Sequence, residues 1–128
     1  MKNTLRKAIF LDHYTAMVFD YNNQTAVLEK TIASEMNPFV KEEILQKGES
    51  HWHNKEQDLQ HDFYKKIIAE VAQCNEVFFF GPTNAKAELI NIIQGKPKFD
   101  AIKIYSKDID KMTENQKIEL ISTTFKIP

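Results

Sequence analysis

The sequence is poor in residues on which several common functions depend. It has one cysteine, Cys74, and one arginine, Arg6, while the other basic residues are lysines. A lone cysteine allows no internal disulfide and fits a reducing cytoplasm. Proteins that read bases or grip phosphates in a bidentate manner use more arginine than this. Because the 17 basic residues are balanced by 18 acidic ones, we expect no DNA partner and no strong general attraction to nucleic acid.

Long apolar runs are also missing. The longest are short clusters such as the one at 76–80, so no segment is expected to cross a membrane. The start of the chain is basic and then apolar, but Asp12 and His13 interrupt the apolar run, and no small-residue cleavage pattern follows. We therefore expect residues 1–128 to form one cytoplasmic domain, which is long enough for a single core.

Five segments have the composition of β-strands: residues 7–11, 16–21, 25–33, 76–81 and 100–105. The first and fourth are continuously apolar, which is typical of central strands covered on both faces. The third alternates, with Ala26, Leu28 and Ile32 expected on one side, and this pattern predicts a half-exposed edge strand. The turn signal at Asn22–Gln24 indicates that the second and third strands form a hairpin.

Helices are expected over 37–46, over about 55–73, after the turn at 81–84, and after residue 113. The longest has apolar residues four apart from Leu59 to Val71, which predicts one buried stripe. Gly95 and the proline that follows it end the next helix. Thr113–Gln116 matches a capping box at the start of the last one.

The order of these elements is β-β-β-α-β-α-β-α. Tight turns join the first three strands, and strand–helix–strand connections with right-handed crossovers join the later ones. The two fully apolar strands belong in the middle of the sheet. The sequence therefore predicts an α/β fold of the ribonuclease H-like type, with a five-stranded mixed sheet of order 3-2-1-4-5 and helices on its faces.

Three stretches carry a likeness to known proteins. They are AIFLDHYTAMVFDY at 8–21, HWHNKEQDLQHDFYKKIIAEVA at 51–72 and EVFFFGPTNAKAELINII at 76–93. In this order and spacing, the chain resembles the central, catalytic domain of the archaeal and eukaryotic class I peptide chain release factors. It resembles more closely the bacterial members of that superfamily labelled translational machinery proteins. The resemblance covers roughly residues 7–125 and implies a role in translation.

One departure from the release factors bears on activity. Their loop before the long helix carries Gly-Gly-Gln, which enters the ribosomal peptidyl transferase centre and promotes peptidyl-tRNA hydrolysis. The corresponding stretch here, KGESHWHNKEQ at 47–57, has one glycine, Gly48, and its Gln57 is not preceded by glycines. The backbone freedom of a glycine pair is missing. We therefore do not expect release activity by that mechanism.

The same stretch holds the strongest candidates for function. His51, His53 and Gln57 are the catalytic candidates, since a histidine near its ordinary pKa can act as a general base. Trp52 could stack on unpaired bases, or it could fold back onto the core or a partner chain. Lys55 is a second binding candidate beside it. Because the remaining residues are small or polar, we expect 47–55 to be mobile or held only by its neighbours.

We expect neither a metal nor another cofactor. His51 and His53 could share a metal on an extended loop, with His61 as a third ligand, but structural zinc sites show a second tight ligand pair that is missing here. A ribonuclease H-like nuclease would need converging carboxylates. Asp12, Asp20 and Asp62 form an incomplete set, and Asp12 is better explained as closing its hairpin turn.

The turn after the fourth strand is the other candidate site. Gly81, Thr83, Asn84 and Lys86 could bind an anion at the start of the following helix. The stretch is not a phosphate-binding P-loop, because one glycine is present and no Gly-Lys-Ser/Thr follows. The alternative, which we favour, is that Gly81 simply permits a tight turn between strand and helix.

Three functional hypotheses remain open at this point. The first is a non-catalytic release-factor-like domain that binds a translation component, either the ribosome or tRNA. The second is a peptidyl-tRNA or ester hydrolase that uses the histidine-containing stretch 47–57. The third is a protein–protein adaptor in which the edge strand 25–33 pairs with another chain, including a second copy in a homo-oligomer.

Overall fold

A computed structural model of the chain describes residues 5–35 and 49–126, and it describes side chains throughout these ranges except at 49–55 and 126. The short helix expected over 37–46 therefore lies outside the described residues. Among the helices that are described, none combines the length and the hydropathy needed to cross a bilayer.

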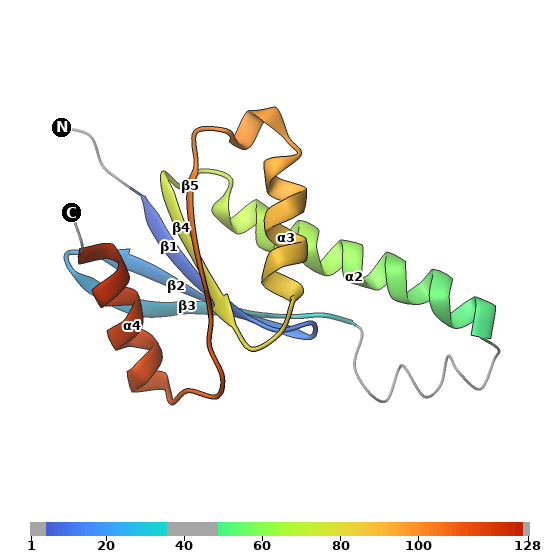
Figure 1. The fold of residues 1–128 in the computed structure, drawn as a ribbon, viewed down its shortest axis with the longest axis horizontal. Coiled ribbons are helices and arrows are strands. Elements are labelled where there is room, and N and C mark those ends of the chain that lie inside the picture. Colours follow the sequence, from blue (N-terminus) through green and yellow to red (C-terminus); the bar gives the residue numbers. More distant parts are fainter. Residues whose placement is uncertain (1–4, 36–48, 127–128) are drawn as a thin grey trace.

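The described residues form an α/β fold on a five-stranded mixed sheet of order β3-β2-β1-β4-β5 (Figure 1). The strands are β1 (Arg6–Leu11), β2 (Thr15–Asn22), β3 (Thr25–Ala33), β4 (Glu76–Gly81) and β5 (Lys103–Asp108). β1 pairs antiparallel with β2 and parallel with β4, so it joins the meander to the parallel part of the sheet. The predicted strand order, with the two apolar strands in the middle, is confirmed.

Helices cover both faces of this sheet. They are α2 (Glu49–Val71), α3 (Ala85–Gln94) and α4 (Glu114–Lys126), with a 3₁₀ turn, η1, at Pro97–Phe99. α2 and α3 lie on one face and α4 on the other (Figure 1). Alternate side chains of the central strands enter the two cores, so Phe79 packs under α2 and α3 while Phe78 packs under α4. A core on each side explains why these strands are apolar throughout.

The predicted turn and cap signals are confirmed. The β2–β3 hairpin turns through Asn23 and Gln24, whose φ angles of 53° and 63° suit a tight two-residue turn. At the start of α4, the Thr113 N–H donates to Gln116 Oε1 over 2.9 Å, and the Gln116 N–H donates to Thr113 Oγ1 over 3.2 Å. This reciprocal pair is a capping box, and it satisfies backbone donors of the first turn.

The expected alternation of β3 is wrong because the strand contains a β-bulge. Leu28 pairs with Phe19 and Lys30 pairs with Val18, so Glu29 is an extra residue. The bulge reverses the order of faces beyond it. Ala26 therefore packs in the core under α4, whereas Ile32 packs against the core under α2. One inserted residue is enough to separate side chains that the pattern had placed together.

β5 also begins later than expected, at Lys103 instead of residue 100. The reason is η1, which buries Phe99 in the core under α2 and α3. The Ile102 N–H then donates to the Phe99 carbonyl over 3.0 Å, so the chain is still turning at this point. The strand can start only after that turn is complete.

Candidate functional site

The stretch with the strongest candidate residues is helical where the structure describes it. α2 begins at Glu49, six residues before the expected start near Lys55. His51, Trp52, His53 and Lys55 thus lie on the first two turns of a helix and not in a loop. The interpretation of 47–55 as a loop is wrong for the part from Glu49 onward, and residues 47 and 48 lie outside the described residues.

The first turns of α2 extend beyond the sheet. Leu59 is the first residue of α2 with a described, buried side chain, whereas Gln57 and Asp58 are exposed. Ten residues separate Glu49 from Leu59, a length of about 15 Å in a helix. Figure 1 shows this end of α2 extending past the rest of the sheet and past α3. The candidate residues therefore lie on a projecting helix end, which we call the tip of α2 (residues 49–58).

A helix changes which of these residues can act together. Positions two apart in a helix are about 200° apart around its axis, so positions 51 and 53 do not face a common point. His61 is ten residues beyond His51, about 15 Å further along α2. The shared metal site that an extended loop could form is therefore disfavoured by the helical backbone. Among the side chains that the structure describes, no three metal-ligating residues lie close enough to hold an ion.

The turn after β4 is held by internal contacts. The Lys86 ammonium, which is almost fully buried, donates to the carbonyls of Gly81 over 3.1 Å and Thr83 over 2.7 Å, and it pairs with the Asp108 carboxylate over 2.5 Å. These three acceptors match its three donors. The Thr83 hydroxyl also accepts from the Ala85 N–H over 3.2 Å. Asn84 is the N-cap of α3, without a side-chain hydrogen bond there.

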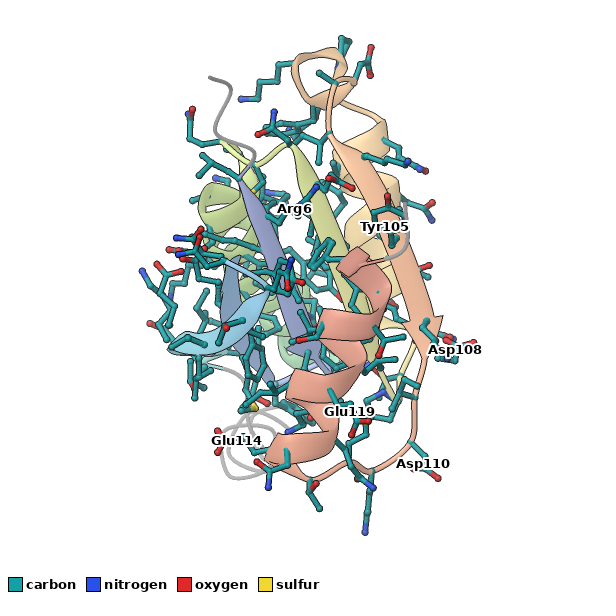
Figure 2. All side chains as sticks on the ribbon, turned by 90° about the vertical axis from the view of Figure 1, so that its left-hand side faces the viewer. Arg6, Tyr105, Asp108, Asp110, Glu114 and Glu119 are labelled. Atoms are coloured by element: carbon teal, nitrogen blue, oxygen red, sulfur yellow. The ribbon has the colours of Figure 1, made fainter. Side chains whose placement is uncertain are left out.

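Gly81 is required by close packing. A Cβ at this position would overlap the carbonyl oxygen of Leu11, and the backbone has a φ of +158°. The Gly81 carbonyl accepts from the Ile109 N–H over 3.0 Å as well as from Lys86. Together these contacts give the turn a structural role, and its geometry offers no separate support for an anion site. Asp108, whose side chain is 94% exposed, projects from the edge of β5 (Figure 2).

The carboxylates of the nuclease hypothesis do not converge. Asp12 accepts from the backbone N–H groups of Tyr14 over 2.7 Å and Thr15 over 2.8 Å, and so closes the β1–β2 turn. Asp20 lies near the other end of this hairpin, paired in register with Lys7, and Asp62 is exposed on α2. Two divalent ions would need several of these groups at one point. The structural interpretation of Asp12 is confirmed.

The structure brings together three residues that sequence reasoning missed. The Tyr64 hydroxyl of α2 donates to Glu88 Oε1 of α3 over 2.6 Å, and Glu88 Oε2 lies 3.5 Å from His13 Nε2 in the β1–β2 turn. Burial raises the pKa of Tyr64, and the Glu88 carboxylate raises it further, so the hydroxyl stays a donor. This cluster ties three elements at one corner of the sheet. It was missed because its members are far apart in sequence.

A second polar cluster lies at the opposite end of the sheet, on the α4 face. Arg6 Nε donates to Glu76 Oε2 over 2.7 Å, and the Tyr105 hydroxyl donates to Glu76 Oε1 over 2.9 Å. Burial acts to raise the pKa of Glu76, but these two hydrogen bonds hold it below its ordinary value. Figure 2 shows Arg6 and Tyr105 near this end of the sheet. The only arginine of the chain is thus engaged in joining β1, β4 and β5.

Known proteins resemble this chain in their fold, whereas no sequence comparison gives a match. No protein-family model and no curated sequence matches the chain. Two solved structures of Pelota are similar to it. The Archaeoglobus fulgidus protein has a TM-score of 0.61 at 8% identity over 95% of this chain, and the Thermoplasma acidophilum protein has 0.60 at 13% identity over 93%. An archaeal translation termination factor is similar with a TM-score of 0.54, at 12% identity over 93% of this chain.

This likeness is one of fold. At these identities it does not carry over a site residue by residue. The chain also spans only about a third of each neighbour, namely 32% of either Pelota and 34% of the termination factor. Nevertheless, the expected fold type is confirmed over nearly the whole chain, and one of the similar structures comes from the class of protein that the sequence motifs resemble.

Proposed function

We propose that the chain is a non-catalytic, release-factor-like domain that binds a translation component, the ribosome or tRNA, through the tip of α2. The observation that carries the proposal is the shared fold with an archaeal translation termination factor over 93% of the chain. It agrees with the three sequence stretches that resemble the central domain of release factors and their bacterial relatives. Such a domain would act in the cytoplasm, where its partner is found.

The tip of α2 is the element best suited to the contact. It projects from the sheet, so a partner could reach it without disturbing the core (Figure 1). Trp52 and Lys55 combine an aromatic surface with a positive charge, and these are the groups that stack on bases and contact phosphates. Because the net charge of the chain is only −1, binding should depend on this local contact more than on a general field.

The direct test is co-sedimentation of the purified chain with ribosomes, at low and at moderate salt. We expect Trp52→Ala and Lys55→Ala to weaken binding, the first by about tenfold or more if the indole stacks on a base. Lys66→Ala is the matched control, since Lys66 is an exposed lysine on the packed part of the same helix. A wild-type chain that stays in the supernatant at both salt concentrations, and fails to bind labelled tRNA, removes the proposal.

The structure gives no support to the hydrolase hypothesis. In a helix, positions 53 and 57 fall on one side and position 51 falls on another, so His51, His53 and Gln57 cannot converge as they could in an extended loop. We therefore expect no peptidyl-tRNA hydrolysis by the purified chain. Activity that a His51→Ala/His53→Ala double variant abolishes would reverse this conclusion.

A further inference from the structure

The two edges of the sheet differ in what they expose. β5 exposes mostly charged and polar side chains, including Lys103, Lys107 and Asp108. β3 is the longest described strand, and it exposes two large apolar side chains, Val27 at 58% and Leu28 at 37%. Charged, irregular edges resist pairing with another chain, whereas exposed apolar ones invite it. Among the described strands, β3 pairs only with β2, so no described strand covers its outer edge.

The charged residues of β3 are held on one face of the sheet. Glu29 Oε2 lies 3.1 Å from Lys7 Nζ, and Lys30 Nζ lies 3.0 Å from Glu70 Oε2 of α2. Lys7 Nζ also lies 3.6 Å from Glu70 Oε1, which links the two pairs. A lysine and a bulge commonly protect an edge. Here the contacts with Lys7 and Glu70 hold both charged groups on the α2 face of the sheet.

The bulge makes β3 complementary to itself. If two copies pair antiparallel about a two-fold axis between residues 29 and 30, Glu29 of each copy stands opposite Lys30 of the other. In this register Val27 is opposite Ile32. Both lie on the α2 face, because their partners in β2 are Asp20 and Ala16.

The remaining pair also matches. Leu28 is opposite Thr31, and both lie on the α4 face because they pair with Phe19 and Met17 of β2. Without the extra residue Glu29, these opposing pairs would point to opposite faces of the sheet. The bulge thus permits registers of this kind, and the Glu29–Lys30 charges select one of them.

We propose that β3 pairs with β3 of a second copy of this chain, antiparallel and centred between Glu29 and Lys30, to join two sheets into one. A two-fold axis perpendicular to the sheet keeps its faces in common, so both α2 helices would lie on the same side of the joined sheet. This inference does not rest on the proposed function. Ribosome binding and self-association can each fail without the other.

Charge exchange provides the test, with sedimentation velocity as the readout over a wide range of protein concentration. Wild-type chain should form a concentration-dependent dimer. Glu29→Lys and Lys30→Glu should each raise the dissociation constant about tenfold or more, since each variant places like charges opposite one another. An equal mixture of the two variants should dimerise again, because each variant then meets its complement. Lys107→Glu on the β5 edge is the control and should leave the dimer unchanged.

Two results would overturn the proposal. One is a wild-type chain that stays monomeric at every concentration. The other is a dimer that survives in both charge variants. Circular dichroism checks that each variant is folded, because both lose an ion pair within the chain. If either is unfolded, Val27→Lys replaces the test, since Val27 is exposed and outside the core. That variant should also weaken the dimer, and an unchanged dimer would count against the register.

Discussion

The two parts of α2 differ in how they are placed against the sheet. From Leu59 to Val71 a buried stripe fixes the helix on the sheet, with Phe63 at 1% and Ile67 at 0% exposure. From Glu49 to Asp58 the same helix continues beyond the sheet. The packed part also holds the contacts of Tyr64 with Glu88 and of Glu70 with Lys30. Stability should therefore depend on the packed part of α2, whereas the proposed binding would depend on the tip.

The sharpest test of this division compares a truncation in each part. Phe63→Ala should lower the free energy of unfolding by about 3–5 kcal/mol, because it removes a buried ring and leaves a cavity. Gln57→Ala, on the exposed tip, should change it by less than about 0.5 kcal/mol. Urea denaturation followed by circular dichroism measures both. Similar losses in the two variants would show that the tip is packed in solution and that the division is wrong.

A smaller effect is expected at the contact between α2 and α3. Tyr64→Phe removes the hydrogen bond to Glu88 without opening a large cavity, and should cost about 1 kcal/mol. Because the pKa of Tyr64 is raised by burial and by Glu88, its contribution is present below the ordinary tyrosine pKa of about 10 and is lost as pH rises above it. Unfolding at pH 7 and at alkaline pH should therefore show the difference between wild type and variant decreasing. A difference that grows with pH would contradict this assignment.

A still smaller effect is expected where α2 meets β1 and β3. The hydrogen bond from Lys30 lowers the pKa of Glu70, with Lys7 adding to it against the opposing effect of burial. A lowered carboxyl pKa stabilises the fold above the unfolded-state value of about 4.3, and this stabilisation is lost as pH falls through the folded-state value. Glu70→Gln should therefore cost about 0.5–1 kcal/mol at pH 7, and this cost should decrease as the pH falls below the unfolded-state value. Asp58→Asn, at an exposed position of the same helix, is the control.

The contrast within α2 also explains what the sequence could and could not reveal. The strand order was predictable because continuous apolar runs mark strands that are covered on both faces. The packed part of α2 was predictable for a similar reason, since burial imposes a stripe from Leu59 to Val71. The sequence of the tip has no such apolar stripe, so periodicity could not mark these turns as helical. The helical state of these turns was therefore missed.

Two other features were beyond the sequence for different physical reasons. Because of the bulge at Glu29, every later residue of β3 lies on the opposite face of the sheet from the one expected. The polar sequence around Glu29 does not show where the extra residue is. The cluster of His13, Tyr64 and Glu88 joins residues that only the folded sheet brings together. Local patterns report what a single element buries. They do not report which exposed ends of different elements meet.

The smallest effect is expected for the two histidines of the tip. His51→Ala/His53→Ala should leave the melting temperature within about 2 °C of wild type, with or without a chelator. Alanine is the better helix former, so any change should be a slight gain in stability if the tip is helical in solution. If a metal held the tip, the chelator would lower the melting temperature of the wild type, and the double variant would abolish that fall. An outcome of this kind would mean that the tip is stabilised by a ligand, and that the separation of packed and projecting parts of α2 is not complete.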